Sequence, residues 1–151
     1  MIANRLLIVS NRLPLIARLE DGRVRLTNAS GGLATGLKSW HQRSNSVWIG
    51  WPGPTHLFTP SQHLDLQRAL VERGVVGLSL SAQEVQYYYQ GFSNHVLWPL
   101  FHYLVDRVPV DASGWDMYRQ VNEKFARAVV ETYRPGDTIW IHDYQLMLVA
   151  A

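Results

Sequence analysis

The chain has 151 residues, of which 47% are hydrophobic, enough to bury the core of one domain. Its formal net charge of +2 is too small to argue for a nucleic-acid partner, although most basic residues are Arg, which suits forked recognition of phosphate or carboxylate. The absence of Cys excludes disulfides and thiolate metal sites, and no apolar run has the length of a signal peptide or a membrane span, so we expect a cytoplasmic protein without a membrane partner.

Strands and helices are predicted to alternate along the first half of the chain. A short continuous apolar run is typical of a buried parallel strand, whereas apolar residues at spacings of three and four indicate a helix. The predicted elements are, in order, a strand over 6–9, a polar turn-rich segment to Ser30, a helix over 33–42, a strand over 47–51, and a helix that begins at Thr59 and Pro60 and ends at Gly74.

The second half continues the alternation. A capping box at Ser81–Glu84 predicts a helix that breaks near Gly91, and Ser113 with Asp116 predicts the cap of a long helix. The stretch 87–103 is too aromatic for a solvated helix face, so we expect it to line a cleft. The remaining predicted elements are a strand over 75–80, a strand after Pro135-Gly136, and the start of an apolar helix over 144–151.

This alternation predicts a doubly wound α/β domain with a parallel sheet. No internal repeat or interdomain linker is visible. The last predicted helix stops at Ala151 without a capping signal, so we expect the chain to be a fragment of a longer protein.

Arg12 and the Gly31-Gly32 pair are the first candidate site residues. Arg12 follows the first strand and the glycines open the next helix, so a guanidinium and free backbone amides could converge on a phosphate. Two plainer interpretations stay open. The glycines could allow close helix packing, and Arg12 could form a surface salt bridge.

Aromatic residues supply the second group of candidates. Trp51 ends a strand before Pro-Gly-Pro, where an indole can face a cleft, although a buried core Trp is the alternative. From the aromatic stretch, Tyr89 is chosen as a hydrogen-bond donor to a phosphate and Trp98 as a platform on which a sugar stacks. Spacing alone does not select them over the other tyrosines of that stretch, Tyr87, Tyr88 and Tyr103.

His142 and Asp143 end the last predicted strand, at the sheet edge where ligands bind in open parallel sheets. Asp143 could instead cap the following helix, or could do both. We expect no metal site, because Pro99 separates His95 from His102 and no carboxylate completes a ligand set.

Five blocks together resemble the trehalose-6-phosphate synthase family, in the family's order and spacing along essentially the whole chain. They are SNRLP at 10–14, SGGLATGL at 30–37, IGWPG at 49–53, YYYQGFSNHVLWPLFHY at 87–103 and WIHDYQLMLV at 140–149. Many members have His where this chain has Gln145, a difference that we treat as variation within the family.

The resemblance implies a retaining glucosyltransferase of the two-domain GT-B fold, with residues 1–151 as most of the Rossmann-like N-terminal acceptor-binding domain. The family transfers glucose from a nucleotide sugar, usually UDP-glucose, to glucose 6-phosphate without a cofactor or metal. The resemblance assigns the acceptor to Arg12, Trp51, Tyr89, Trp98 and Asp143, the last also orienting the attacking hydroxyl. It assigns the donor diphosphate to the amides of Gly31 and Gly32, and leaves His142 as a neighbour without a role.

Several consequences and alternatives accompany this resemblance. Without the C-terminal nucleotide-binding domain the chain alone is expected to be inactive, and the full-length protein could form a homo-oligomer. Glucosylglycerol-phosphate synthase, or a pseudo-glycosyltransferase with another acceptor, is the alternative enzyme. A noncatalytic sugar-phosphate-binding module is the alternative from another class.

Overall fold

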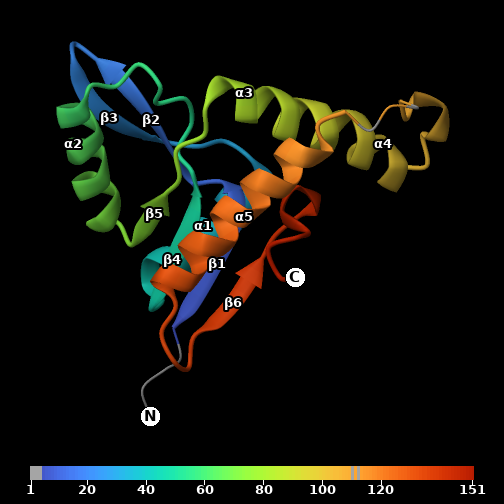
Figure 1. Ribbon diagram of the computed structural model, residues 1–151. Coiled ribbons are helices and arrows are strands. Elements are labelled where there is room, and N and C mark those ends of the chain that lie inside the picture. Colours follow the sequence, from blue (N-terminus) through green and yellow to red (C-terminus); the bar gives the residue numbers. More distant parts are fainter. Residues whose placement is uncertain (1–4, 110, 112) are drawn as a thin grey trace.

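A four-stranded parallel sheet forms the centre of the protein (Figure 1). The structure is a computed structural model and describes residues 5–109, 111 and 113–151. The strand order is β5-β4-β1-β6. These strands are β1 (Leu6–Arg12), β4 (Ser46–Trp51), β5 (Val75–Gly77) and β6 (Thr138–Ile141). Both neighbours of β1 pair with it in parallel, which confirms the predicted parallel sheet.

The sheet is buried on both faces, because successive side chains of a strand point to opposite sides. Ile8 lies in a cluster on one face with Leu66 and Leu70 of α2 (Pro60–Val71), against which Leu37 of α1 (Gly32–Arg43) packs. Val9, the next residue, lies in a second cluster on the other face. That cluster includes Val121, Phe125 and Val129 of α5 (Trp115–Thr132) and Tyr88 and Phe92 of the aromatic stretch. The domain is therefore doubly wound, as predicted.

Two helix starts have the predicted capping chemistry. Thr59 accepts a hydrogen bond from the backbone N–H of Gln62, whose side chain accepts one from Thr59, and Pro60 follows. Ser81 and Glu84 form the same reciprocal pair at the start of α3 (Ala82–Glu84). These local signals were read correctly because each cap needs only residues three positions apart.

The prediction of a turn-rich segment before Ser30 was wrong. An antiparallel hairpin occupies it, formed by β2 (Leu15–Glu20) and β3 (Arg23–Asn28). Asp21 and Gly22, with φ of 50° and 73°, form its two-residue turn. The strands alternate apolar and polar residues, and Ala17, Val24 and Leu26 pack toward the cluster of α2, which supplies the burial that the many charged residues obscured.

The predicted break near Gly91 was also wrong. The chain stays helical through η1, a π-helix over Val85–Leu97, and continues into α4 (Trp98–Phe101). The wider turn brings Tyr88, Phe92 and Ser93 to the buried side. The backbone N–H of Trp98 donates to the Ser93 carbonyl five residues earlier. Gly91 is tolerated within this helix, which extends away from the sheet before η2 (Val105–Arg107) (Figure 1).

Two further end signals were misjudged. Gly114, with φ of 98°, occupies the N-cap position of α5 and no side chain caps that helix, so Ser113 does not have the predicted role. The expected apolar helix over 144–151 is a short 3₁₀ helix, η3 (Tyr144–Leu146), followed by turns. The backbone N–H of Val149 bonds the carbonyl of Leu146 only three residues earlier, which is the tighter 3₁₀ pattern.

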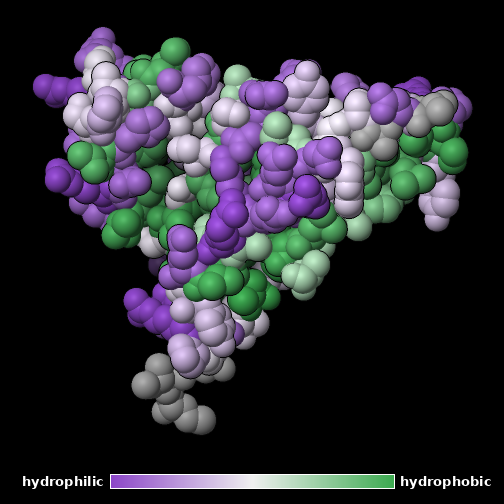
Figure 2. Space-filling view, in the orientation of Figure 1, coloured by the Kyte–Doolittle hydropathy of each residue, from purple (hydrophilic) through white to green (hydrophobic). Residues whose placement is uncertain are grey.

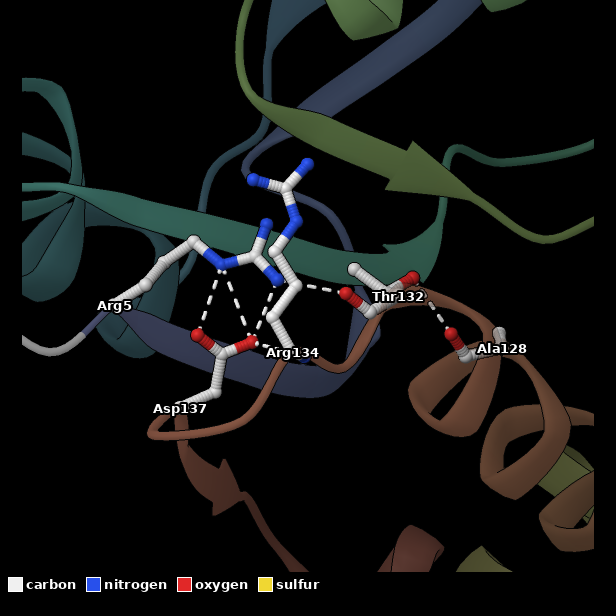
Figure 3. Close-up of polar contacts among 5 residues, drawn as sticks. All are labelled: Arg5, Ala128, Thr132, Arg134 and Asp137. Carbon is white, nitrogen blue, oxygen red and sulfur yellow. Dashed lines mark hydrogen bonds and ion pairs between the residues drawn. The ribbon is translucent and has the colours of Figure 1, made fainter.

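An ion pair joins the amino-terminal ends of β1 and β6, remote from the carboxyl ends of the strands (Figure 3). The Arg5 guanidinium lies 2.6 Å from Asp137 and donates to the Thr132 carbonyl at 2.7 Å. The backbone N–H of Arg134 donates to the same Asp137 carboxylate. The hydrogen bond from Arg5 holds the pKa of Asp137 below its usual value. The pair thereby ties β1 to the turn that follows α5.

The outer surface of α5 is hydrophilic. Figure 2 shows a polar band along this helix. The exposed residues of α5 include Arg119, Glu123 and Arg127. A helix with one buried and one charged face lies at the protein surface. Among the described residues, no helix is long and apolar enough to cross a membrane.

Candidate functional site

A cavity of about 840 Å³ opens at the carboxyl ends of β1 and β4. Strand β2 of the hairpin and the first turn of α1 contribute to its walls. Its lining contains most of the predicted site residues, namely Arg12, Gly31, Gly32, Trp51, Tyr89 and Asp143. The sheet brings these residues together because its parallel strands all end at the same edge.

Arg12 lies between two aromatic rings that come from different elements. It pairs with Trp51 in the β1–β4 register, and its guanidinium carbon is 5.4 Å from the centroid of that indole. On its other side the ring of Tyr89 is 5.3 Å away. Among the described residues Arg12 has no carboxylate partner, so the salt-bridge interpretation is not supported and its N–H donors remain available for a ligand.

Buried polar contacts hold the backbone on which Arg12 sits. The Trp48 indole N–H donates to the Ser10 hydroxyl at 2.7 Å, and that hydroxyl donates to the Arg12 carbonyl at 2.7 Å. The Tyr88 hydroxyl donates to the Asn11 side-chain oxygen at 3.0 Å and thereby connects η1 to the strand end. Sequence analysis did not assign these positioning roles, because the partners lie far apart in the chain.

Trp51 belongs to the core and to the cavity wall at once. Its side chain is 5% exposed and packs in the same cluster as Val9, as the core interpretation expects. It also lines the cavity, as the cleft interpretation expects. Its indole N–H is buried without a hydrogen-bond partner among the described residues, a costly arrangement that a ligand oxygen could relieve.

Gly31 and Gly32 bring an uncapped helix terminus to the cavity. No side chain caps α1, and its first turn contains no acidic residue. A Cβ atom added at either glycine would meet no described atom within 4 Å, so packing against the protein does not account for the pair. Gly31 has φ of 145°, which favours glycine. The free N–H groups of this turn suit an anion.

Asp143 caps the following helix and also lines the cavity. One carboxylate oxygen accepts a hydrogen bond from the Tyr144 N–H at 2.8 Å, so the residue caps η3. The side chain is exposed and lines the cavity. Its backbone has φ of 74° and ψ of 164°, a conformation that few residues other than glycine adopt and that is typical of functional sites.

His142, the residue before Asp143, does not line the cavity. Its backbone N–H donates to the Val9 carbonyl at 2.8 Å, and its ring packs on Trp140 at 4.3 Å between centroids. Burial lowers the pKa of His142, although the nearby Asp143 acts in the opposite direction. Its Nε2 atom is buried without a partner among the described residues. These contacts favour a neutral imidazole that supports the strand end.

The model of Glycosyltransferase family 20 matches residues 4–151. The chain belongs to this family. An α,α-trehalose-phosphate synthase of Aspergillus fumigatus is 42% identical over 148 residues, which cover 96% of this chain and 28% of that protein. The chain therefore spans less than a third of the length of this relative. The predicted resemblance is confirmed.

Solved structures of the same family have the same fold. A Burkholderia xenovorans trehalose-phosphate synthase in complex with glucose-6-phosphate is 26% identical, with a TM-score of 0.68 over 98% of this chain and 30% of that one. An E. coli trehalose-6-phosphate structure bound with UDP-2-fluoro glucose is 30% identical, with a TM-score of 0.67 over 97% and 29%. The predicted fold class, a Rossmann-like half of a GT-B fold, is confirmed.

Within this glycosyltransferase family 20 chain, Trp98 is the predicted acceptor-binding residue that does not line the cavity. Its side chain is 39% exposed on α4 and stacks on the ring of His102 at 4.2 Å. The His102 Nδ1 atom donates to the Trp98 carbonyl at 2.7 Å, which holds the pair together. Its role in stacking on a sugar stays a prediction.

The structure separates Tyr89 from the other tyrosines of the aromatic stretch. Tyr88 is fully buried, Tyr87 is 48% exposed and Tyr103 is 91% exposed, and of the four only Tyr89 lines the cavity. Burial raises the pKa of Tyr88 well above its usual value, so this phenol remains a neutral hydrogen-bond donor. The choice of Tyr89 by resemblance therefore agrees with the geometry.

Sequence analysis did not assign several of the cavity residues, among them Arg18 and Gln145. Arg18 lines the cavity from β2, and Gln145 lines it from η3. The signal for Arg18 was the alternation of the hairpin strands, and that for Gln145 was its place directly after the candidate Asp143. No three metal-ligating side chains gather in the part of the chain that the structure describes.

Proposed function

We propose that this chain serves α,α-trehalose-phosphate synthesis, the transfer of glucose from a nucleotide sugar such as UDP-glucose to glucose 6-phosphate with retention. Two kinds of relative support the proposal. The Aspergillus fumigatus relative is a UDP-forming α,α-trehalose-phosphate synthase, and the Burkholderia xenovorans structure contains glucose-6-phosphate. The E. coli structure is bound with a UDP-2-fluoro glucose ligand.

The observation that carries the proposal is the position of Arg12 between Trp51 and Tyr89, in one cavity with Asp143. The guanidinium would bind the acceptor phosphate through charge-assisted hydrogen bonds, and the Tyr89 hydroxyl would donate to the same group. The Trp51 indole would wall the sugar, and Trp98 would stack on it from α4. The free oxygen of Asp143 would accept a hydrogen bond from an acceptor hydroxyl.

The proposed reaction needs orientation more than a protein nucleophile. The donor diphosphate would lie on the free N–H groups at Gly31 and Gly32, beside the acceptor. The acceptor oxygen would bond to the anomeric carbon on the face from which the diphosphate leaves. The acceptor proton would pass to a diphosphate oxygen as the carbon–oxygen bond of the donor breaks. Asp143 would orient the attacking hydroxyl, and proximity would supply much of the rate enhancement.

Further parts of the proposal concern the whole protein. Residues 1–151 would make up most of an acceptor-binding domain, with the nucleotide bound chiefly by a second domain, so we expect no turnover by this chain alone. A cytoplasmic location and a homo-oligomeric full-length protein stay predictions. The flat indole of Trp51 in the cavity wall suits a pyranose acceptor better than glycerol 3-phosphate, and competition between the two acceptors would distinguish the enzymes.

Calorimetric titration of the chain with glucose 6-phosphate tests the proposal. We expect Arg12→Gln to weaken binding by roughly tenfold or more, because a charged hydrogen bond to phosphate is lost. Arg43→Gln is the matched control, since Arg43 is exposed at the far end of α1 and does not line the cavity. Equal affinities of the Arg12→Gln variant and the unchanged chain would contradict the proposed acceptor site.

A further inference from the structure

The hairpin β2–β3 places two like charges directly opposite each other. In its antiparallel register Arg18 pairs with Arg25, and the next pair toward the turn on the same face of the hairpin is Glu20 with Arg23. Side chains at directly opposite positions lie on the same face of a hairpin. Like charges in this arrangement destabilise a hairpin, whereas the Glu20–Arg23 pair is complementary. A pair of adjacent guanidinium groups is therefore a feature that folding alone does not favour.

These two arginines have no carboxylate within ion-pair distance among the described residues. Both side chains are exposed, so their donors are open to solvent. Adjacent, solvated guanidinium groups present several N–H donors to one anion, which would also offset the repulsion between them.

Arg18 also lines the cavity that contains Arg12. Arg12 ends β1, whereas Arg18 lies in the middle of β2, on the other side of the loop at Leu13 and Pro14. The cavity, about 840 Å³, lies in the upper part of the range for sites of drug-sized ligands. It thus has a second cationic position, on the hairpin.

We propose that Arg18 and Arg25 form an outer anion subsite that binds a phosphoryl group separately from the anion at Arg12. The proposal goes beyond the acceptor site, which uses Arg12, Trp51 and Tyr89. Its ligand class is a phosphate monoester or inorganic phosphate, recognised by the guanidinium group of Arg18, which lines the cavity, together with that of Arg25 opposite it on the hairpin. Occupation of this subsite would stabilise the hairpin in its observed register, because the bound anion offsets the repulsion between Arg18 and Arg25.

Titration with inorganic phosphate tests this subsite. The arginine Nε–Hε signals of the isotope-labelled chain report which side chains bind. In an Arg12→Gln background, we expect the Arg18 signal still to shift on addition of phosphate. Adding Arg18→Gln should weaken the remaining phosphate affinity by roughly tenfold, as for loss of a charged hydrogen bond. Arg25→Gln should have a smaller effect in the same direction.

Arg23→Gln is the matched control, because it removes the same charge from the same hairpin at the position opposite Glu20. It should change phosphate affinity by less than about twofold, in line with loss of long-range charge alone. A second measurement is the thermal midpoint without phosphate, which Arg25→Thr should raise because it removes the like-charge pair.

The outcomes separate this inference from the proposed function. Equal losses for Arg18→Gln and Arg23→Gln, or disappearance of all phosphate binding in Arg12→Gln, would overturn the subsite. Persistence of the Arg18 shift while glucose 6-phosphate fails to bind at Arg12 would overturn the acceptor assignment and leave the subsite standing.

Discussion

At the scale of single residues, two histidines are placed where burial disfavours their charged form. The Nδ1 atom of His41 is 2.6 Å from the Ser46 hydroxyl, and its Nε2 atom is 3.3 Å from the Arg73 carbonyl. Because a carbonyl only accepts, Nε2 carries the proton and Nδ1 accepts from the hydroxyl. Burial lowers the pKa of His41 and also that of His142. Both rings are therefore neutral in the folded chain near neutral pH.

This arrangement predicts how stability depends on pH. A histidine with a lowered folded pKa stabilises the fold fully above its unfolded pKa of about 6.5, and this contribution is lost as the pH falls below that value. The unfolded chain binds more protons there, so the free energy of unfolding decreases with acid. Urea unfolding of His41→Gln at about pH 7.5 and about pH 5.5 should show a smaller difference than the unchanged chain shows.

His95→Gln is the control for this measurement, because His95 is exposed on η1. It should leave the difference between the two pH values as it is in the unchanged chain. An equal reduction in both variants would mean that the burial of His41 has no special part in the pH dependence.

At the scale of elements, the start of α5 passes very close to the aromatic π-helix. A Cβ atom at Gly114 would lie 2.6 Å from the Tyr87 carbonyl oxygen and 3.4 Å from the Phe92 Cβ. Gly114 has φ of 98°, so it meets both a steric and a conformational requirement for glycine. This close approach lets Phe92 reach the ring of Tyr118, at 4.9 Å between centroids.

We therefore expect Gly114→Ala to lower the free energy of unfolding by about 1–3 kcal/mol, as strained backbone positions do. Gly36→Ala is the matched control within a helix, because its Cβ would meet nothing within 4 Å. That substitution should raise stability by about 0.5–1 kcal/mol through helix propensity. Chemical denaturation of the two variants measures both effects, and a stabilised Gly114→Ala would refute the close approach.

At the scale of the whole molecule, stability depends on two hydrophobic clusters separated by the sheet. Phe125 is fully buried in the cluster of α5, whereas Val130 on the same helix is 75% exposed. The same cluster includes Trp51 and Tyr88, which lie beside Arg12 and Asn11 at the strand end. Packing around Phe125 therefore supports the wall of the candidate site.

We expect Phe125→Ala to cost about 3–5 kcal/mol, because it leaves a large cavity in a close-packed core. Val130→Ala should change stability by less than about 0.5 kcal/mol, as is usual for exposed positions. Thermal and urea unfolding compare the two. Similar effects at both positions would show that α5 does not pack on the sheet through the face that contains Phe125.

Much of the fold could be predicted locally. Caps at Thr59 and Ser81 and the buried strand at 6–9 were correct, because each depends on residues within a few positions of one another. The hairpin was missed because its charged residues hid the alternation, even though Asp21-Gly22 is a strong turn signal. The π-helix was missed because a Gly-containing aromatic segment has no simple period, and the contacts that accompany the wider turn, such as packing on α5, join residues far apart in the chain.

The candidate site divides in the same way. The amino-acid sequence by itself determined which polar side chains follow the strands, among them Arg12 and Asp143, and the chemistry that they offer. Only the tertiary structure decided that Trp51 and Tyr89 lie on either side of Arg12, that Trp98 stacks on His102 instead, and that Arg18 joins the cavity. The physical reason is that local periodicity specifies the direction of a side chain within its own element, whereas strand order and packing decide which distant side chains meet.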